Sequence, residues 1–229
     1  MLPAQKLAQL RQNGGVYFDL DGTLLDTAAD FQIVLNSLCI DHGIVPPAPT
    51  AVQATVSAGA RALVAMTFNM DAGDSAFAGL LEEMLHRYGQ QIVNSQARLY
   101  PGMAELLEQL EQANIVWGVV TNKPVRYSRP LLQSLGLLHR CNVVICPDDV
   151  QRTKPDPEPL LLAAARTNKD ATCSIYVGDH PRDIDAGKAA GMTTIAAAYG
   201  YLPDSPAIEL WGADIVVTDV VQISKLLWP

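Results

Sequence analysis

The chain has 229 residues, of which 49% are hydrophobic and 17% charged, and its formal net charge is −8. This composition can bury a sizeable core and excludes a disordered chain, while the negative charge argues against a general nucleic-acid binder, which would carry a basic face. No stretch is long and apolar enough to span a bilayer, and the N-terminus lacks the apolar core of a signal peptide. The cysteines form no CxxC pair. We therefore expect a soluble cytoplasmic protein that binds neither nucleic acid nor membrane.

Short apolar runs, mostly continuous rather than alternating, predict strands that are covered on both faces. In chain order they span residues 16–18, 115–120, 143–146, 174–177, 193–198 and 214–217. Helical periodicity separates them at residues 103–114, 125–135, 157–167 and 183–190. This alternation predicts a Rossmann-like α/β core, in which a parallel sheet carries helices on both faces.

One region breaks the alternation, because residues 30–96 contain no convincing strand. Helical periods cover residues 31–42, 52–68 and 76–87. An all-helical block inserted after the first strand of an α/β sheet is typical of a lid. We therefore predict a core formed by residues 1–29 and 97–229, with a helical cap domain at residues 30–96.

Ligands of open parallel sheets bind where the strands end, and polar side chains follow the first four predicted strands. These are Asp19 and Asp21 after the first strand, Thr121, Asn122 and Lys123 after the second, Lys154 in the loop after the third, and Asp179 and Asp183 after the fourth. Carboxylate oxygens suit Mg²⁺, and a metal and a lysine can together neutralise the oxygens of a transferring phosphoryl group. One carboxylate can form an aspartyl-phosphate, while a second protonates the leaving oxygen and later activates water.

The same residues form a set of motifs in a fixed order. They are DxDGT at residues 19–23, a hydroxyl at Thr121, a lysine at Lys154 in TKPDP, and the acidic cluster of Asp179 and Asp183 in GDHPRD. In this respect the chain resembles the haloacid dehalogenase superfamily, and the resemblance covers essentially the whole chain. It implies the α/β core with an inserted cap and a dependence on Mg²⁺.

The resemblance also implies individual roles. Asp19 is the expected nucleophile and a metal ligand, and Asp21 the acid–base, whose backbone carbonyl also binds the metal. Thr121 and Asn122 are expected to hold phosphoryl oxygens, and Lys154 to balance their charge. Asp179 is an expected Mg²⁺ ligand, and Asp183 acts either as a ligand or in support of one. His180 stands where relatives often carry a small hydroxyl residue, and we expect it to affect solvation or substrate shape.

Within the superfamily, two branches are similar to this chain. TNKP at 121–124, KPDPEP at 154–159 and Tyr-Gly-Tyr at 199–201 resemble phosphoglycolate phosphatases. VSAGARAL at 56–63, WGVVTNKPVR at 117–126, ICPDDV at 145–150 and WGADIVV at 211–217 resemble phosphatases of N-acetylmuramic acid 6-phosphate. The first branch implies a Mg²⁺-dependent hydrolase of a small phosphomonoester such as phosphoglycolate, and the second provides the alternative substrate.

Substrate binding outside the core motifs is expected from Arg61 and Lys123, each of which has a plain surface charge as its alternative. Arg61 lies close to Gly59 at a helix start, a position that suits an anion. A haloacid dehalogenase generally lacks the second aspartate of DxD, so Asp21 argues against that activity. A phosphomutase of the β-phosphoglucomutase type would keep every core motif, whereas a non-catalytic binding protein would tolerate their loss. The sequence leaves monomer and homodimer open.

Overall fold

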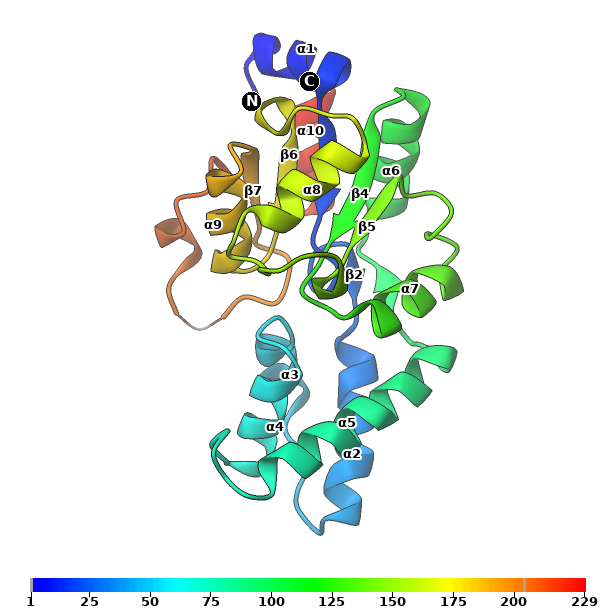
Figure 1. Cartoon of the computed structure of the whole chain (residues 1–229), viewed down its shortest axis with the longest axis vertical. Helices are drawn as coiled ribbons and strands as arrows, with labels where there is room; N and C mark the ends of the chain where they lie inside the picture. The colour runs from blue at the N-terminus through cyan, green and yellow to red at the C-terminus, as the bar shows by residue number, and fades with distance from the viewer. Residues whose placement is uncertain (1, 204) are drawn as a thin grey trace.

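The computed structural model describes residues 2–203 and 205–229. A sheet with flanking helices forms one lobe and a cluster of helices forms the other (Figure 1). Both chain ends lie on the sheet lobe, at the end far from the helical lobe (Figure 1). None of the helices in the described residues has the length and apolar character needed to cross a bilayer.

The central sheet is parallel and, within the described residues, has six strands in the order β5–β4–β1–β6–β7–β8. They are β1 (Gly15–Phe18), β4 (Val116–Val120), β5 (Val143–Ile145), β6 (Ile175–Gly178), β7 (Thr193–Ala197) and β8 (Ile215–Val217). Every residue of β1, β6 and β7 is buried, as continuous apolar runs require when helices cover both faces of a sheet. Each strand coincides with a predicted one, so the predicted parallel core is confirmed.

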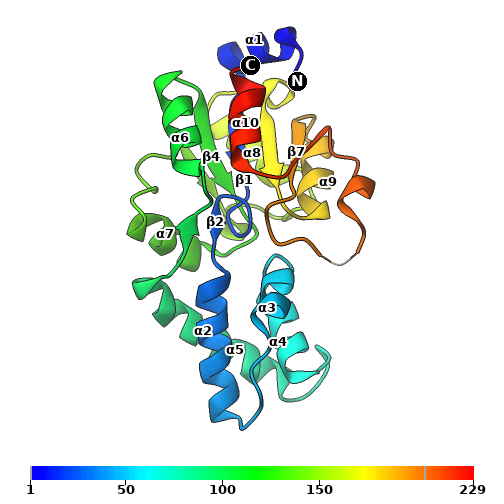
Figure 2. The same ribbon diagram turned by 180° about the vertical axis from the view of Figure 1, so that it is seen from behind.

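Helices cover both faces of this sheet. The helices α6 (Met103–Gln112), α7 (Val125–Ser134) and α10 (Val220–Leu227) contribute to one apolar cluster, and α8 (Glu158–Arg166) and α9 (Pro181–Ala189) to the cluster on the other face. Figure 2 shows α6 and α10 in front of the strands. The sequence did not predict α1 (Ala4–Asn13) or α10. Of the α1 side chains, Leu7 and Leu10 are the buried ones, which is too few to produce a visible helical period.

The helical lobe is the inserted block, with α2 (Ala28–Asp41), α3 (Pro49–Val56), α4 (Ala60–Phe68) and α5 (Phe77–Gln91). Its apolar cluster includes Phe31 stacked on Tyr88, with ring centroids 4.3 Å apart. The prediction of one helix over residues 52–68 is wrong, because α3 ends before Ser57 and Gly59 has φ +92°, a conformation that favours glycine. The resulting loop, residues 57–59, borders the cavity described below.

The helical lobe joins the core through a short antiparallel ribbon formed by β2 (Leu25–Asp26) and β3 (Arg98–Leu99). The buried carboxylate of Asp30 accepts hydrogen bonds from Gln91, Ser95 and the backbone N–H of Gln96, so the two ends of the insert are tied together. The helices run from Ala28 to Gln91 and a 3-10 turn follows at Ile92–Asn94. Cap boundaries at residues 30 and 96 stay a prediction.

Candidate active site

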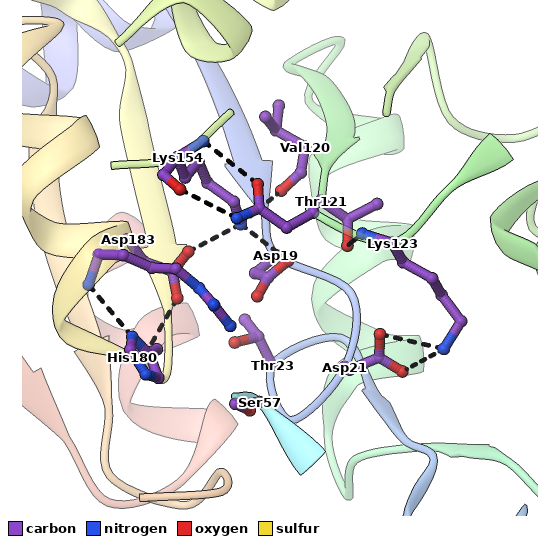
Figure 3. Close-up of polar contacts among 12 residues, drawn as sticks. Asp19, Asp21, Thr23, Ser57, Val120, Thr121, Lys123, Lys154, His180 and Asp183 are labelled. Atoms are coloured by element: carbon purple, nitrogen blue, oxygen red, sulfur yellow. Dashed lines mark hydrogen bonds and ion pairs between the residues drawn. The ribbon is translucent and has the colours of Figure 1, made fainter. Parts of the chain in front are cut away.

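The predicted site residues meet at the carboxyl ends of the strands. Asp19 follows β1, Thr121 follows β4, Asp179 follows β6, and Lys154 reaches the same edge from the loop after β5. Figure 3 shows Lys154, Asp19 and Asp183 converging, while Asp21 and Lys123 form a separate pair. The strand order places β1 between β4 and β6, so these side chains come together although they are far apart in the sequence.

Lys154 is a fully buried cation at the centre of this group. Its Nζ donates hydrogen bonds to Val120 O (3.0 Å), Tyr176 Oη (2.7 Å) and Asp183 Oδ1 (2.7 Å). Burial alone would lower the pKa of Lys154, but the carboxylates of Asp183 and Asp19 outweigh it and raise that pKa. The ammonium group therefore stays charged, and its three donors point in fixed directions.

Asp19 lies beside this cation without being satisfied by it. The distance from Lys154 Nζ to Asp19 Oδ1 is 2.9 Å, which makes an ion pair, yet this buried oxygen accepts no well-directed hydrogen bond from the residues that the structure describes. Because Lys154 has already used its donors, Asp19 Oδ1 is left with charge attraction alone. A buried carboxylate oxygen of this kind is suited to a cation or to an electrophile.

Asp179 is held by donors from both lobes. Its Oδ1 accepts from Thr23 Oγ1 (3.1 Å), and its Oδ2 accepts from Ser57 Oγ (2.8 Å) and from the backbone N–H of Tyr201 (2.8 Å). Burial, followed by the nearby Asp19 carboxylate, raises the pKa of Asp179 well above its usual value. A positive ion beside Asp179 would stabilise its ionised form and lower that pKa.

These carboxylates form a group that fits a divalent metal. Asp19, Asp179 and Asp183 are all buried and each offers an oxygen within 4.8 Å of the others. The backbone also approaches closely: Gly22 has φ +80°, and a Cβ there would lie 2.0 Å from Asp179 Oδ2. An all-oxygen set with an unsatisfied carboxylate and a tight backbone wall has the chemistry that Mg²⁺ prefers.

Asp183 is less available than the other two. Its Oδ1 accepts from Lys154, and its Oδ2 accepts from the backbone N–H of His180 (3.1 Å). It therefore orients Lys154 while remaining within reach of a metal. His180 begins α9, where its Nδ1 accepts from the backbone N–H of Arg182. Burial, followed by the charge of Arg182, lowers the pKa of His180 to about 4, so its ring is neutral at neutral pH.

Asp21 has partners of its own. Its carboxylate accepts from Thr27 Oγ1 (2.6 Å) and from Lys123 Nζ, at 2.8 Å to Oδ1 and 3.1 Å to Oδ2. The same Nζ lies 4.9 Å from the ring centroid of Phe31 and 4.5 Å from that of Tyr88, both in the cap. Lys123, expected to bind substrate, is thus engaged with Asp21 and with two cap rings.

Thr121 and Asn122 are also placed at the strand ends, but their side chains differ in availability. Thr121 Oγ1 accepts from the backbone N–H of Lys123 (3.1 Å) and can still donate. The Asn122 amide pairs twice with the Lys154 backbone, at 2.9 and 3.2 Å. A phosphoryl contact from Asn122 would therefore come from its backbone N–H, since its side chain holds the Lys154 loop.

A cavity of about 430 Å³ opens above these residues and beneath the cap. Its floor includes Asp19, Asp21 and Thr121, and its roof includes Ser57 and Arg61. Arg61 lines both this cavity and a second, open groove, and its guanidinium lies 5.3 Å from the ring centroid of Phe77, which borders the groove. A contact from Arg61 to the substrate stays a prediction. Arg126 packs over Tyr127 and borders the same open groove.

Several residues of the site were not predicted. Tyr176 holds Lys154, Ser57 and Tyr201 hold Asp179, and Arg182 lines the cavity. The sequence contained one usable signal, since Ser57 precedes Gly59, and a glycine can end a helix and turn the chain. Tyr176 sits inside an apolar strand run, where it reads as a core residue.

Comparison with known proteins agrees with this geometry. The family model of the haloacid dehalogenase-like hydrolases matches residues 16–197. The N-acetylmuramic acid 6-phosphate phosphatase of Pseudomonas aeruginosa is 46% identical over 214 residues, covering 93% of each chain. The phosphoglycolate phosphatase of Xanthomonas campestris pv. campestris is 42% identical over 217 residues, covering 93% of this chain and 96% of that protein.

A solved structure extends the likeness to three dimensions. The crystal structure of a predicted phosphoglycolate phosphatase from Haemophilus somnus 129PT superimposes with a TM-score of 0.81 at 26% identity. The match covers 94% of this chain and 98% of that one. The likeness therefore includes the helical insert as well as the sheet.

Proposed function

The chain belongs to the haloacid dehalogenase-like hydrolases and is a phosphatase of small phosphate esters; from this premise we propose that its substrate is N-acetylmuramic acid 6-phosphate. The sequence interpretation placed phosphoglycolate first and this sugar acid second. The Pseudomonas relative named for the sugar acid is more similar than the Xanthomonas relative named for phosphoglycolate, which favours the second reading.

The size of the cavity is the structural observation that carries the proposal. At about 430 Å³ it lies in the range of pockets that enclose a ligand the size of a drug molecule. Phosphoglycolate is a two-carbon acid and would leave much of this space to water. A phosphorylated amino sugar with a lactyl ether would fill it, with the phosphate at Asp19 and the sugar beneath the cap.

In the proposed reaction an Asp19 oxygen attacks phosphorus and the bond to the sugar O6 breaks. Asp21 enters this step protonated and gives its proton to that leaving oxygen. Asp21 then takes a proton from water, whose oxygen attacks phosphorus, so the bond to Asp19 breaks and inorganic phosphate leaves. The two carboxylates have separate partners, Lys154 for Asp19 and Lys123 for Asp21, which supports separate roles.

The remaining predicted residues have roles in binding charge. Mg²⁺ held by Asp19 and Asp179, with the Asp21 carbonyl and Asp183 as further candidates, would supply positive charge for the phosphoryl oxygens. Lys154 adds a second positive charge, and the Thr121 hydroxyl can donate to an oxygen of the same group. Arg61 is the proposed contact from the cap to the sugar acid.

A substrate panel tests the proposal. Purified protein is assayed for phosphate release from N-acetylmuramic acid 6-phosphate, phosphoglycolate and glucose 1-phosphate, with Mg²⁺ and with EDTA. We expect the highest kcat/KM for the sugar acid and no activity with EDTA or in Asp19→Asn, while Asp71→Asn, an exposed cap position, keeps wild-type activity. A higher kcat/KM for phosphoglycolate would overturn the substrate, and isomerisation of glucose 1-phosphate faster than its hydrolysis would replace the hydrolase by a mutase.

A further inference from the structure

Two arginines line the cavity, one from each lobe. Arg61 lies near the start of α4 in the cap, and Arg182 lies in the first turn of α9 in the core. The ion pairs around the strand ends are Lys123–Asp21, Lys154–Asp19 and Lys154–Asp183, and neither arginine takes part in them. Among the residues that the structure describes, each of the two lysines therefore has a carboxylate partner within ion-pair distance, and neither arginine has one.

Arg182 is also poorly satisfied as a hydrogen-bond donor. Its Nε is buried, yet among residues 2–203 and 205–229 it has no hydrogen-bond partner. The backbone of Arg182 is fixed, because its N–H donates to His180 Nδ1 (3.3 Å). Buried donors are nearly always paired in folded proteins. The Arg182 guanidinium lies beside the cavity with an unpaired Nε–H, so we infer that its acceptor is a group of the ligand.

The phosphoryl group is not the acceptor that best explains Arg182. Lys154 pairs with Asp19, and Thr121 lines the cavity together with Asp19, so both are already placed for the phosphoryl group of the proposed reaction. A guanidinium is a planar fork that matches a carboxylate through two parallel hydrogen bonds. We propose that Arg182 binds a carboxylate on the leaving group of the substrate, opposite Arg61, so that the enzyme selects phosphate esters that are also carboxylic acids.

This inference rests on the proposed phosphatase function and narrows its substrate class. The lactyl group of N-acetylmuramic acid 6-phosphate carries such a carboxylate, whereas N-acetylglucosamine 6-phosphate lacks the lactyl group altogether. Phosphoglycolate carries one as well, and 2-hydroxyethyl phosphate is its counterpart without the acid. Since Arg61 and Arg182 come from different lobes, a carboxylate between them would also hold the cap over the core.

The experiment compares kcat/KM within these two pairs of substrates, acid against neutral, for the wild type and for Arg182→Gln. A charge-assisted hydrogen bond to a carboxylate corresponds to a preference of about 10- to 100-fold, and we expect the wild type to prefer the acid by that factor. Arg182→Gln should lose most of the preference, mainly through a higher KM for the acid. Arg129→Gln, on the exposed side of α7, is the matched control and should retain it.

Two further variants test the geometry. Arg182→Lys keeps the charge and loses the fork, so an intermediate preference is expected even if Arg182→Gln folds poorly. If Arg61 and Arg182 bind the same carboxylate, the double variant Arg61→Gln/Arg182→Gln should lose less than the product of the two single losses. Fully multiplicative losses would place the two arginines on different groups of the substrate and overturn the shared site.

Other outcomes separate this inference from the proposed function. Equal losses for acid and neutral esters in the folded Arg182 variants would place Arg182 at the phosphoryl group and overturn the inference, as would no loss at all. The wild type could instead hydrolyse only phosphoglycolate and 2-hydroxyethyl phosphate, prefer the acid, and lose that preference in Arg182→Gln. This result would overturn the sugar acid as the substrate and would support the carboxylate site.

Discussion

The hydroxyl of Ser57, at the end of α3 in the cap, donates a 2.8 Å hydrogen bond to Asp179 Oδ2 at the end of β6 in the core. Ser57 is buried, and so is Asp179. A cap residue therefore touches a carboxylate of the proposed metal site directly. The position of the cap and the shape of that site are linked by this contact.

Removal of the Ser57 hydroxyl tests this link. Supporting hydrogen bonds to metal ligands commonly change metal affinity by about 10- to 100-fold. Ser57→Ala should therefore raise the Mg²⁺ concentration needed for half-maximal activity by about 10-fold, measured by titrating Mg²⁺ at saturating substrate. Ser134→Ala, an exposed hydroxyl on α7 that bonds only its own helix, is the control. An unchanged Mg²⁺ requirement in Ser57→Ala would show that the contact does not support the metal site.

Gly22 provides a test of the close approach between the backbone and the Asp179 carboxylate. A methyl group there would lie 2.0 Å from Asp179 Oδ2 on a residue with φ +80°, so Gly22→Ala must displace the carboxylate. A shift of about 1 Å at a reacting centre can cost about 100-fold in rate, and we expect at least that loss in kcat. Gly43→Ala is a matched control, because Gly43 has φ +67° with nothing within 4 Å of the added Cβ. It should lose about 1–2 kcal/mol of stability through backbone strain and keep its activity.

Lys123 joins Asp21 to the cap. Lys123→Met would leave the Asp21 carboxylate without its cation. It would also remove the ammonium group that lies over the Phe31 and Tyr88 rings. Breaking a buried pair by removing one partner costs about 3–5 kcal/mol, and because Asp21 is partly exposed we expect about 2–3 kcal/mol in urea unfolding. Lys123→Arg should retain most of that stability. If Lys123→Met were as stable as the wild type, neither the ion pair with Asp21 nor the contact of Lys123 with the two cap rings would contribute to stability.

His180 predicts a dependence of stability on pH. Its pKa is lowered from 6.5 in a free histidine to about 4, so the unfolded chain binds a proton that the folded chain does not accept. Stability from the neutral ring is present above about pH 6.5 and is lost as the pH falls through about 4. Because the ring is only partly buried, we expect this loss to be about 1–2 kcal/mol.

The variant His180→Asn isolates this effect. Asparagine can also begin a helix through a side-chain hydrogen bond, so the α9 start is preserved while the titrating group is removed. Urea unfolding of both proteins between pH 7 and pH 4 is the measurement. A fall in stability of equal size in the two proteins would assign the acid sensitivity to other groups.

The strand ends were predictable because two simple regularities locate them. Continuous apolar runs mark buried strands, and parallel strands bring their carboxyl ends to one edge, so the positions of Asp19, Thr121, Lys154 and Asp179 at that edge follow from the sequence. The split between α3 and α4 was missed because the apolar period over residues 52–68 continues across it. The conformation at Gly59, with φ +92°, separates α4 from α3, which ends at Val56.

Contacts between lobes were beyond the reach of sequence patterns. Ser57 and Asp179 are 122 residues apart, and no local period connects them. The sequence placed Asn122 and Lys123 at the correct edge of the sheet but did not predict the partners of their side chains. Their hydrogen bonds to the Lys154 backbone and to Asp21 depend on loop conformations that residue spacing does not determine.

The short ribbon of β2 and β3 has a consequence for how such enzymes diversify. Because Leu25 pairs with Leu99, the helical insert leaves and re-enters the sheet lobe at neighbouring points, and its helices can lengthen, shorten or be exchanged without any change in strand order. The side chains proposed for catalysis belong to the sheet lobe, so a change in the insert can alter the substrate without altering them. Ser57 shows that the insert also reaches into the sheet lobe, because its hydroxyl donates a hydrogen bond to Asp179.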